Sequence, residues 1–166
     1  MKTLAAVVLG SAMFLAVPVM AEEMGGSAGG SGDTNMDILM QKVKADKKLL
    51  IATNMGLSEA EGKKFWPLYD AYQKELGAIN QRLGQTIKSY ADAYNAGKGS
   101  ISDDTAKKLL NEALSVEEAE VKLKRNYADK IGKVLPATKT ARYIQIENKI
   151  RAIVRMELAQ QIPLVY

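Results

Sequence analysis

The chain has 166 residues, with 23 lysines and arginines against 19 aspartates and glutamates, so its formal net charge is +4. It contains neither cysteine nor histidine. This composition excludes disulfide bonds, zinc sites built from thiolate or imidazole, haem attachment through cysteine, and the Ser-His-Asp and Cys-His sites of hydrolases. The mild excess of bases favours solubility and does not indicate nucleic acid as a partner.

The first 21 residues have the three parts of a secretory signal peptide. Lys2 gives a basic start, residues 4–17 are an apolar run that Pro18 ends, and Val-Met-Ala precedes the expected cleavage after Ala21. The alternative is an uncleaved membrane anchor, but the run is short for a span of about 20 apolar residues. We therefore expect a periplasmic protein with no stable membrane insertion after residues 1–21 are removed.

Residues 22–33 are rich in glycine and serine, which is typical of a flexible leader. A phosphate-binding glycine loop is the sharper alternative. We reject it because no Gly-Lys-Ser/Thr ending is present and no apolar strand precedes the segment. The remaining residues, 34–166, are expected to form a single helical domain.

Apolar residues recur every three or four positions through most of residues 34–161, which is the helical period and fits no strand. A first helix is expected over about 34–54, with Gly56 as its stop. A second begins after Ser58, which forms a predicted capping box with Glu61, and continues to residue 96. Pro67 lies inside this helix and predicts a kink.

The turn at residues 95–100 predicts the end of the second helix, and Ser102 caps a third that Pro136 ends. A fourth helix is expected over 137–161, with Pro163 after it. The predicted fold class is therefore all-α: an antiparallel helical hairpin or bundle of about four helices, whose second is long and kinked. The sequence leaves open whether these helices form an open hairpin or a compact bundle.

Two details of packing also follow from the pattern. Leu110 and Ile153 are placed on the inward apolar stripes of the third and fourth helices. Gly77 and Gly84 lie one heptad apart in the second helix, and we expect them to allow close approach of a neighbouring helix.

Acidic residues precede basic residues by four positions along the predicted helices, which is the favourable order for a solvated helix face. These pairs are Glu59–Lys63, Asp70–Lys74, Asp103–Lys107, Asp104–Lys108, Glu118–Lys122, Glu120–Lys124 and Glu147–Arg151. The clusters Asp103–Asp104 and Glu117, Glu118 and Glu120 have the ligand chemistry of a hard cation site. Adjacent helix positions point in different directions, however, so we expect these acids to bind no metal. We also expect no cofactor and no enzyme activity.

Two helix starts also resemble each other. Leu57-Ser58-Glu59-Ala60-Glu61 aligns with Leu135-Pro136-Ala137-Thr138-Lys139, and a basic-aromatic pair follows in both. With the signal peptide and the cysteine-free helical chain, these motifs resemble the paired Leu-Thr-x-x-Gln motifs of the Spy/CpxP-like periplasmic proteins. The resemblance covers about residues 57–154, with Ser58 and Pro136 in place of Thr and with Glu61 and Lys139 in place of Gln. It implies a curved helical-hairpin homodimer that shields unfolding clients or senses envelope stress.

Two functions follow from these observations. The first is a chaperone-like binding protein, which holds partly folded envelope proteins on an apolar surface with a basic rim. The second is a structural or regulatory adaptor that docks one envelope partner. The candidate rim comprises Lys63, Lys64, Arg82, Lys88, Lys122, Lys124, Arg125, Lys130, Lys133 and Arg142, and the candidate amphipathic contacts are Tyr69, Tyr72 and Tyr90. For any one of these residues, the alternative is that it has no part in binding. The apolar stripes would then form the core, and the bases would only keep the surface soluble.

Overall fold

The structure, a computed structural model, describes residues 46–165. The predicted signal peptide (1–21), the predicted leader (22–33) and the first part of the predicted first helix lie outside the described residues. The described residues fall into two units, 46–56 and 57–165, and each is considered by itself.

Residues 46–55 form a helix that ends before Gly56. Gly56 has a φ of +54°, a left-handed conformation that favours glycine. The predicted stop at Gly56 is therefore confirmed. Within this short helix Ile51 and Met55 are buried, whereas Leu49 is exposed.

The helix α2 (Glu59–Ala96) begins with the predicted capping box. Ser58 Oγ accepts a hydrogen bond from the Glu61 N–H at 3.3 Å, and Glu61 Oε2 accepts one from the Ser58 N–H at 2.7 Å. The helix continues through Pro67 without a break. Because proline has no N–H, one bond of the helix ladder is missing there.

The helix α3 (Asp103–Gly132) follows a tight turn after α2. Lys98 and Gly99 have φ values of +54° and +106°, and a Cβ added at Gly97 would lie 1.9 Å from the Ser100 carbonyl oxygen. The turn therefore requires glycine at position 97. Ser102 caps α3 as predicted, since its Oγ accepts a hydrogen bond from the Thr105 N–H at 3.3 Å.

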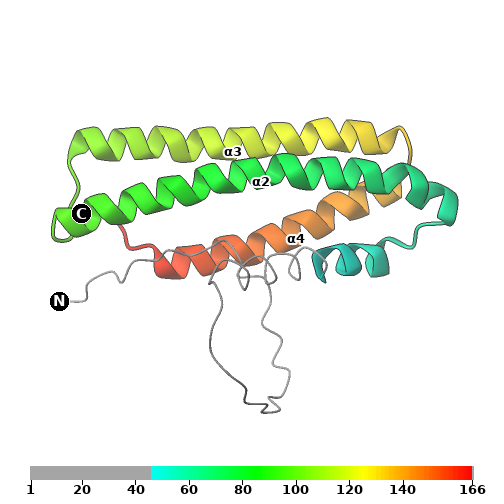
Figure 1. The fold of residues 1–166 in the computed structure, drawn as a ribbon, viewed down its shortest axis with the longest axis horizontal. Helices are drawn as coiled ribbons and strands as arrows, with labels where there is room; N and C mark the ends of the chain where they lie inside the picture. The colour runs from blue at the N-terminus through cyan, green and yellow to red at the C-terminus, as the bar shows by residue number, and fades with distance from the viewer. Residues whose placement is uncertain (1–45, 166) are drawn as a thin grey trace, which may run out of the picture. The chain divides into compact units, whose positions relative to one another are not determined.

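The helix α4 (Ala137–Gln161) follows Pro136, as the sequence predicts. In Figure 1, α2 and α3 lie side by side as an antiparallel hairpin, and α4 starts near the end of α3 and slants away from it. No strand occurs in residues 46–165, and the all-α bundle predicted from the sequence is confirmed. Residues 57–165 by themselves form a three-helix arrangement in which α4 packs on the α2–α3 hairpin.

The core of this unit is built around aromatic rings. Its buried apolar residues in the three helices are Phe65, Tyr69, Tyr72, Leu76 and Ile79 of α2, Val116, Leu123, Tyr127 and Ile131 of α3, and Tyr143 and Ile150 of α4. The Tyr143 ring lies 5.1 Å from the Phe65 ring and 6.0 Å from the Tyr72 ring, both in edge arrangements that aromatic pairs prefer. Large rings therefore fill the space between α2 and α4.

Three expectations about packing are wrong. Leu110 and Ile153 are 59% and 42% exposed, because each lies off the side of its helix that faces the core. A Cβ added at Gly77 or Gly84 would meet nothing within 4 Å, so these glycines do not serve close helix approach.

Candidate functional site

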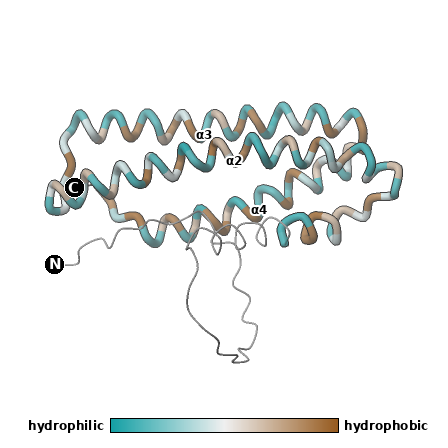
Figure 2. The backbone as a smooth tube through the Cα atoms, in the orientation of Figure 1, coloured by the Kyte–Doolittle hydropathy of each residue, from teal (hydrophilic) through white to brown (hydrophobic). Residues whose placement is uncertain are grey.

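The helix α3 carries exposed apolar side chains at helical spacing. Leu110, Leu114 and Val121 are 59, 49 and 58% exposed. Steps of four and seven residues return to nearly the same side of a helix, so these three side chains form one row, which we call the α3 stripe. Figure 2 shows hydrophobic residues recurring along α3. Buried residues such as Val116 and Leu123 lie on a different side of the helix, so the α3 stripe faces away from the core.

Most of the predicted rim bases lie on the surface. The exposed ones are Lys63, Lys64, Lys88, Lys122, Arg125, Lys133 and Arg142. Lys63 is ion-paired with Glu59 at 2.7 Å and Lys88 with Asp92 at 2.6 Å, both within α2. Arg125 lies one turn beyond Val121 on α3 and therefore borders the α3 stripe.

Of the other three predicted bases, Arg82 and Lys124 connect two helices, and Lys130 makes a contact within its own helix. Arg82 Nη2 of α2 donates to Glu112 Oε1 of α3 at 2.9 Å and to Ser115 Oγ at 3.0 Å. Lys130 Nζ lies 4.3 Å from the centroid of the Tyr127 ring, a cation–π contact within α3. Lys124 Nζ of α3 donates to an oxygen of α4, Asn148 Oδ1. These three bases are partly exposed and make contacts within the chain, and their place on a binding rim stays a prediction.

Two of the three candidate tyrosines belong to the core. Tyr69 and Tyr72 are buried, and burial raises the pKa of both hydroxyls, with nearby carboxylates such as Glu147 adding to the effect. The expectation that these rings offer contacts at the surface is therefore corrected. Tyr90 is half-buried, and its hydroxyl donates to the Pro163 carbonyl at 2.9 Å, which fastens the chain after α4 to α2.

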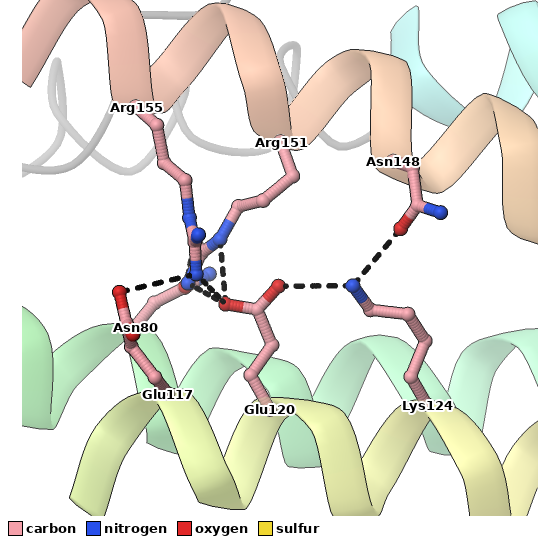
Figure 3. Close-up of polar contacts among 7 residues, drawn as sticks. All are labelled: Asn80, Glu117, Glu120, Lys124, Asn148, Arg151 and Arg155. Atoms are coloured by element: carbon pink, nitrogen blue, oxygen red, sulfur yellow. Dashed lines mark hydrogen bonds and ion pairs between the residues drawn. The ribbon is translucent and has the colours of Figure 1, made fainter. Parts of the chain in front are cut away.

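A buried ionic network, which was not predicted from the sequence, connects the three helices. Glu120 of α3 is 3% exposed, and its Oε2 accepts from Arg151 Nε of α4 at 2.8 Å. Its Oε1 lies 3.3 Å from Lys124 Nζ. We call the residues drawn in Figure 3 the Glu120 cluster: Asn80, Glu117, Glu120, Lys124, Asn148, Arg151 and Arg155.

The outer members of the Glu120 cluster extend it to α2 and along α4. Arg151 Nη1 donates to Asn80 Oδ1 of α2 at 2.8 Å, and Lys124 Nζ donates to Asn148 Oδ1 of α4 at 2.9 Å. Arg155 Nη2 lies 3.6 Å from a carboxylate oxygen of both Glu117 and Glu120. Figure 3 shows the two arginines of α4 converging on the Glu120 carboxylate.

The charges around Glu120 decide its ionisation. Burial alone would raise the pKa of Glu120, but the hydrogen bond and charge of Arg151, together with Lys124, outweigh it and lower the pKa below its usual 4.5. A carboxyl whose pKa is lowered by folding stabilises the fold above its unfolded-state pKa. This contribution is lost as the pH falls through the folded-state pKa, so the Glu120 cluster weakens only below about pH 4.5.

A second buried carboxylate lies nearer the start of α4. Gln73 Nε2 of α2 donates to Glu147 Oε1 at 2.8 Å and lies within 3.4 Å of the Tyr143 hydroxyl. Among the described residues, every buried side-chain nitrogen or oxygen has a hydrogen-bond partner. The polar groups between α2 and α4 are therefore satisfied, as buried polar groups must be.

The sequence did contain a signal for these two carboxylates. Glu120 lies four residues after Val116 and three before Leu123, and Glu147 stands in the same relation to Tyr143 and Ile150. Each acid therefore lies within an apolar stripe, and this position predicts that its side chain is buried. The lysine or arginine four residues later predicts an exposed side chain, and it is the weaker of the two signals. Of the expected solvated pairs, Glu59–Lys63 is confirmed. The pair Glu120–Lys124 also forms, but its carboxylate is buried and not solvated.

The inward side of α4 mixes apolar and charged groups. Its buried residues are Tyr143, Glu147 and Ile150. Full burial of one large apolar side chain contributes about 1.5–3 kcal/mol, whereas leaving one member of a buried ion pair without its partner costs about 3–5 kcal/mol. Removing one partner of the Glu120–Arg151 pair should therefore weaken the attachment of α4 at least as much as exposing one buried apolar side chain would.

No group of three acidic side chains that could hold a metal ion occurs within residues 46–165. Over the same residues, no helix is both long enough and apolar enough to span a bilayer. No family model matches the chain, and no curated protein or solved structure matches it either. The molecule is therefore classed by its fold alone, as an all-α helical bundle.

Proposed function

We propose that this chain is an exported, periplasmic helical protein that holds partly folded proteins on an apolar surface edged by bases, without a reactive group, a cofactor or nucleic acid. The observation that carries the proposal is the α3 stripe. Three large aliphatic side chains, each about half exposed or more, lie in a row on one helix with Arg125 beside them. Apolar rows of this kind favour contact with apolar segments of other chains.

The two motif-like helix starts, on which the proposed resemblance to Spy/CpxP-like proteins depends, contact each other. Lys139 Nζ of the second motif donates to Glu61 Oε2 of the first at 2.7 Å. This hydrogen bond, followed by the one from the Ser58 backbone, lowers the pKa of Glu61. These are the two positions at which the chain departs from the family's Gln, and here an ion pair joins them. A homodimer and a role in envelope stress remain part of the same proposal.

The proposal predicts that the protein delays aggregation of unrelated unfolding proteins. We expect micromolar wild-type protein (residues 22–166) to slow the light scattering of two chemically different clients during refolding from denaturant. Replacing Leu110, Leu114 and Val121 together by serine should remove most of this protection, because the apolar contact area is lost. The fold should persist, since exposed positions rarely contribute much to stability.

The matched control replaces Ile153 and Met156, which are exposed apolar residues of α4, by serine. This variant should protect both clients as well as the wild type does. Equal loss in both variants would show that general surface hydrophobicity, and not the α3 stripe, is responsible. If the wild type protects neither client but captures one envelope protein from an extract, the protein is an adaptor and the holding function is wrong.

A further inference from the structure

The far half of α4 is attached to the hairpin differently from the near half. The buried residues of α4 end at Ile150. Past Ile150 the guanidinium groups of Arg151 and Arg155 reach Glu120, and α4 slants away from α3 toward its C-terminal end (Figures 1 and 3). Ionic contacts, together with the hydrogen bond from the Tyr90 hydroxyl to the Pro163 carbonyl just after α4, therefore hold a stretch of helix that has no fully buried apolar residue.

What α4 covers is an aromatic face of α2. The Tyr143 ring lies 5.1 Å from Phe65, 6.2 Å from Tyr69 and 6.0 Å from Tyr72. Removing α4 from this position would expose these rings of α2, a surface richer in aromatic groups than the α3 stripe. Aromatic rings supply large contact areas in protein binding.

The hairpin has contacts of its own that do not involve α4. Tyr72 and Tyr127 pack with ring centroids 5.4 Å apart, and the Tyr127 hydroxyl donates to Glu75 Oε1 at 2.6 Å. Arg82 and Glu112 join the same two helices at 2.9 Å. The hairpin therefore has reasons to persist when α4 leaves.

From this geometry we infer that α4 is a latch: the Glu120 carboxylate, by binding Arg151 and Arg155, holds α4 over the aromatic face of the hairpin, and release of α4 opens that face as a second surface for partly folded proteins. The inference rests on the proposed function. The latch adds control to that function. With α4 in place the protein offers the α3 stripe, and with α4 released it offers the aromatic face as well.

The test is hydrogen exchange, followed by mass spectrometry, of the wild type and of Glu120→Gln. The substitution removes the charge that the two arginines share and nearly preserves side-chain shape. Amides of residues 137–161 should exchange about 100-fold faster or more, while those of α2 and α3 keep most of their protection. Glu112→Gln is the matched control, because Glu112 is also an ion-paired glutamate of α3 but its partner Arg82 is on α2. Its α4 exchange should equal that of the wild type.

Two outcomes overturn the latch. Either α4 stays as protected in Glu120→Gln as in the wild type, or all three helices lose protection together, which would mean that α4 is not a separable element. A further comparison links the latch to binding. Glu120→Gln should delay client aggregation at a lower protein concentration than the wild type does.

The same data distinguish failure of the latch from failure of the proposed function. In one outcome α4 is released in Glu120→Gln, but neither the wild type nor the variant delays the aggregation of any client. This outcome overturns the proposed function and, with it, any control of that function. Client protection by the wild type, together with unchanged α4 exchange in Glu120→Gln, overturns the latch and leaves the proposed function supported.

Discussion

Replacing Arg151 by methionine should lower the free energy of unfolding by about 3–5 kcal/mol. Arg151 is the main partner of Glu120, and the two side chains are only 13% and 3% exposed. Methionine keeps much of the length of the arginine side chain but leaves the buried Glu120 carboxylate without its strongest partner. The cost of removing that charge from water is then no longer offset by Arg151. Urea denaturation followed by circular dichroism measures the loss.

Two further variants separate this cause from general effects of substitution. Arg155→Met removes a base that is 52% exposed and lies 3.6 Å from the same carboxylate, so its loss should be about 0–1 kcal/mol. Glu120→Leu combined with Arg151→Met removes both charges and should recover much of the lost stability. Similar small losses in Arg151→Met and Arg155→Met would contradict the central position of the Glu120–Arg151 pair.

Replacing Phe65 by alanine should cost about 3–5 kcal/mol, which is typical for a fully buried aromatic residue. Phe65 has no exposed surface, and its ring lies 5.1 Å from both the Trp66 and the Tyr143 rings. The cavity would open between α2 and α4, where rings fill the space. Thermal or urea unfolding gives the size of the loss, and Trp66, the one tryptophan of the sequence, should report the altered surroundings by a shift of its emission.

The control for this cavity is Phe65→Leu, which retains much of the volume and should cost clearly less than alanine. The expected order of stability is wild type, then leucine, then alanine. Equal stability of all three proteins would show that the aromatic cluster does not hold α2 and α4 together.

Local signals predicted much of the fold. The capping box at Ser58 and Glu61, the cap at Ser102 and the helix start after Pro136 all depend on residues within a few positions of one another, so the sequence alone specifies them. The range predicted for the fourth helix, 137–161, agrees with α4. Gly56 behaves similarly, because its left-handed conformation is a local property.

The contacts between helices were harder to predict, since they depend on how α4 lies against the hairpin. Glu120 has a lysine four residues later and therefore resembled a surface acid, yet Arg151 approaches it from another helix. Leu110 fits an inward stripe by spacing, but the rotation of α3 turns it outward. The α3 stripe and the Glu120 cluster both follow from such tertiary placement, which periodicity does not determine.

The most direct test of the proposed holding function is site-specific photocrosslinking from α3 to an unfolding client. A photoreactive side chain in place of Leu114 should crosslink to a chemically unfolded protein, because this position is at the centre of the α3 stripe. The same group in place of Asn126, an exposed polar position of α3, should crosslink weakly. Strong and selective crosslinking at position 114 is the predicted result, and equal crosslinking at the two positions, or none at either, would contradict the account.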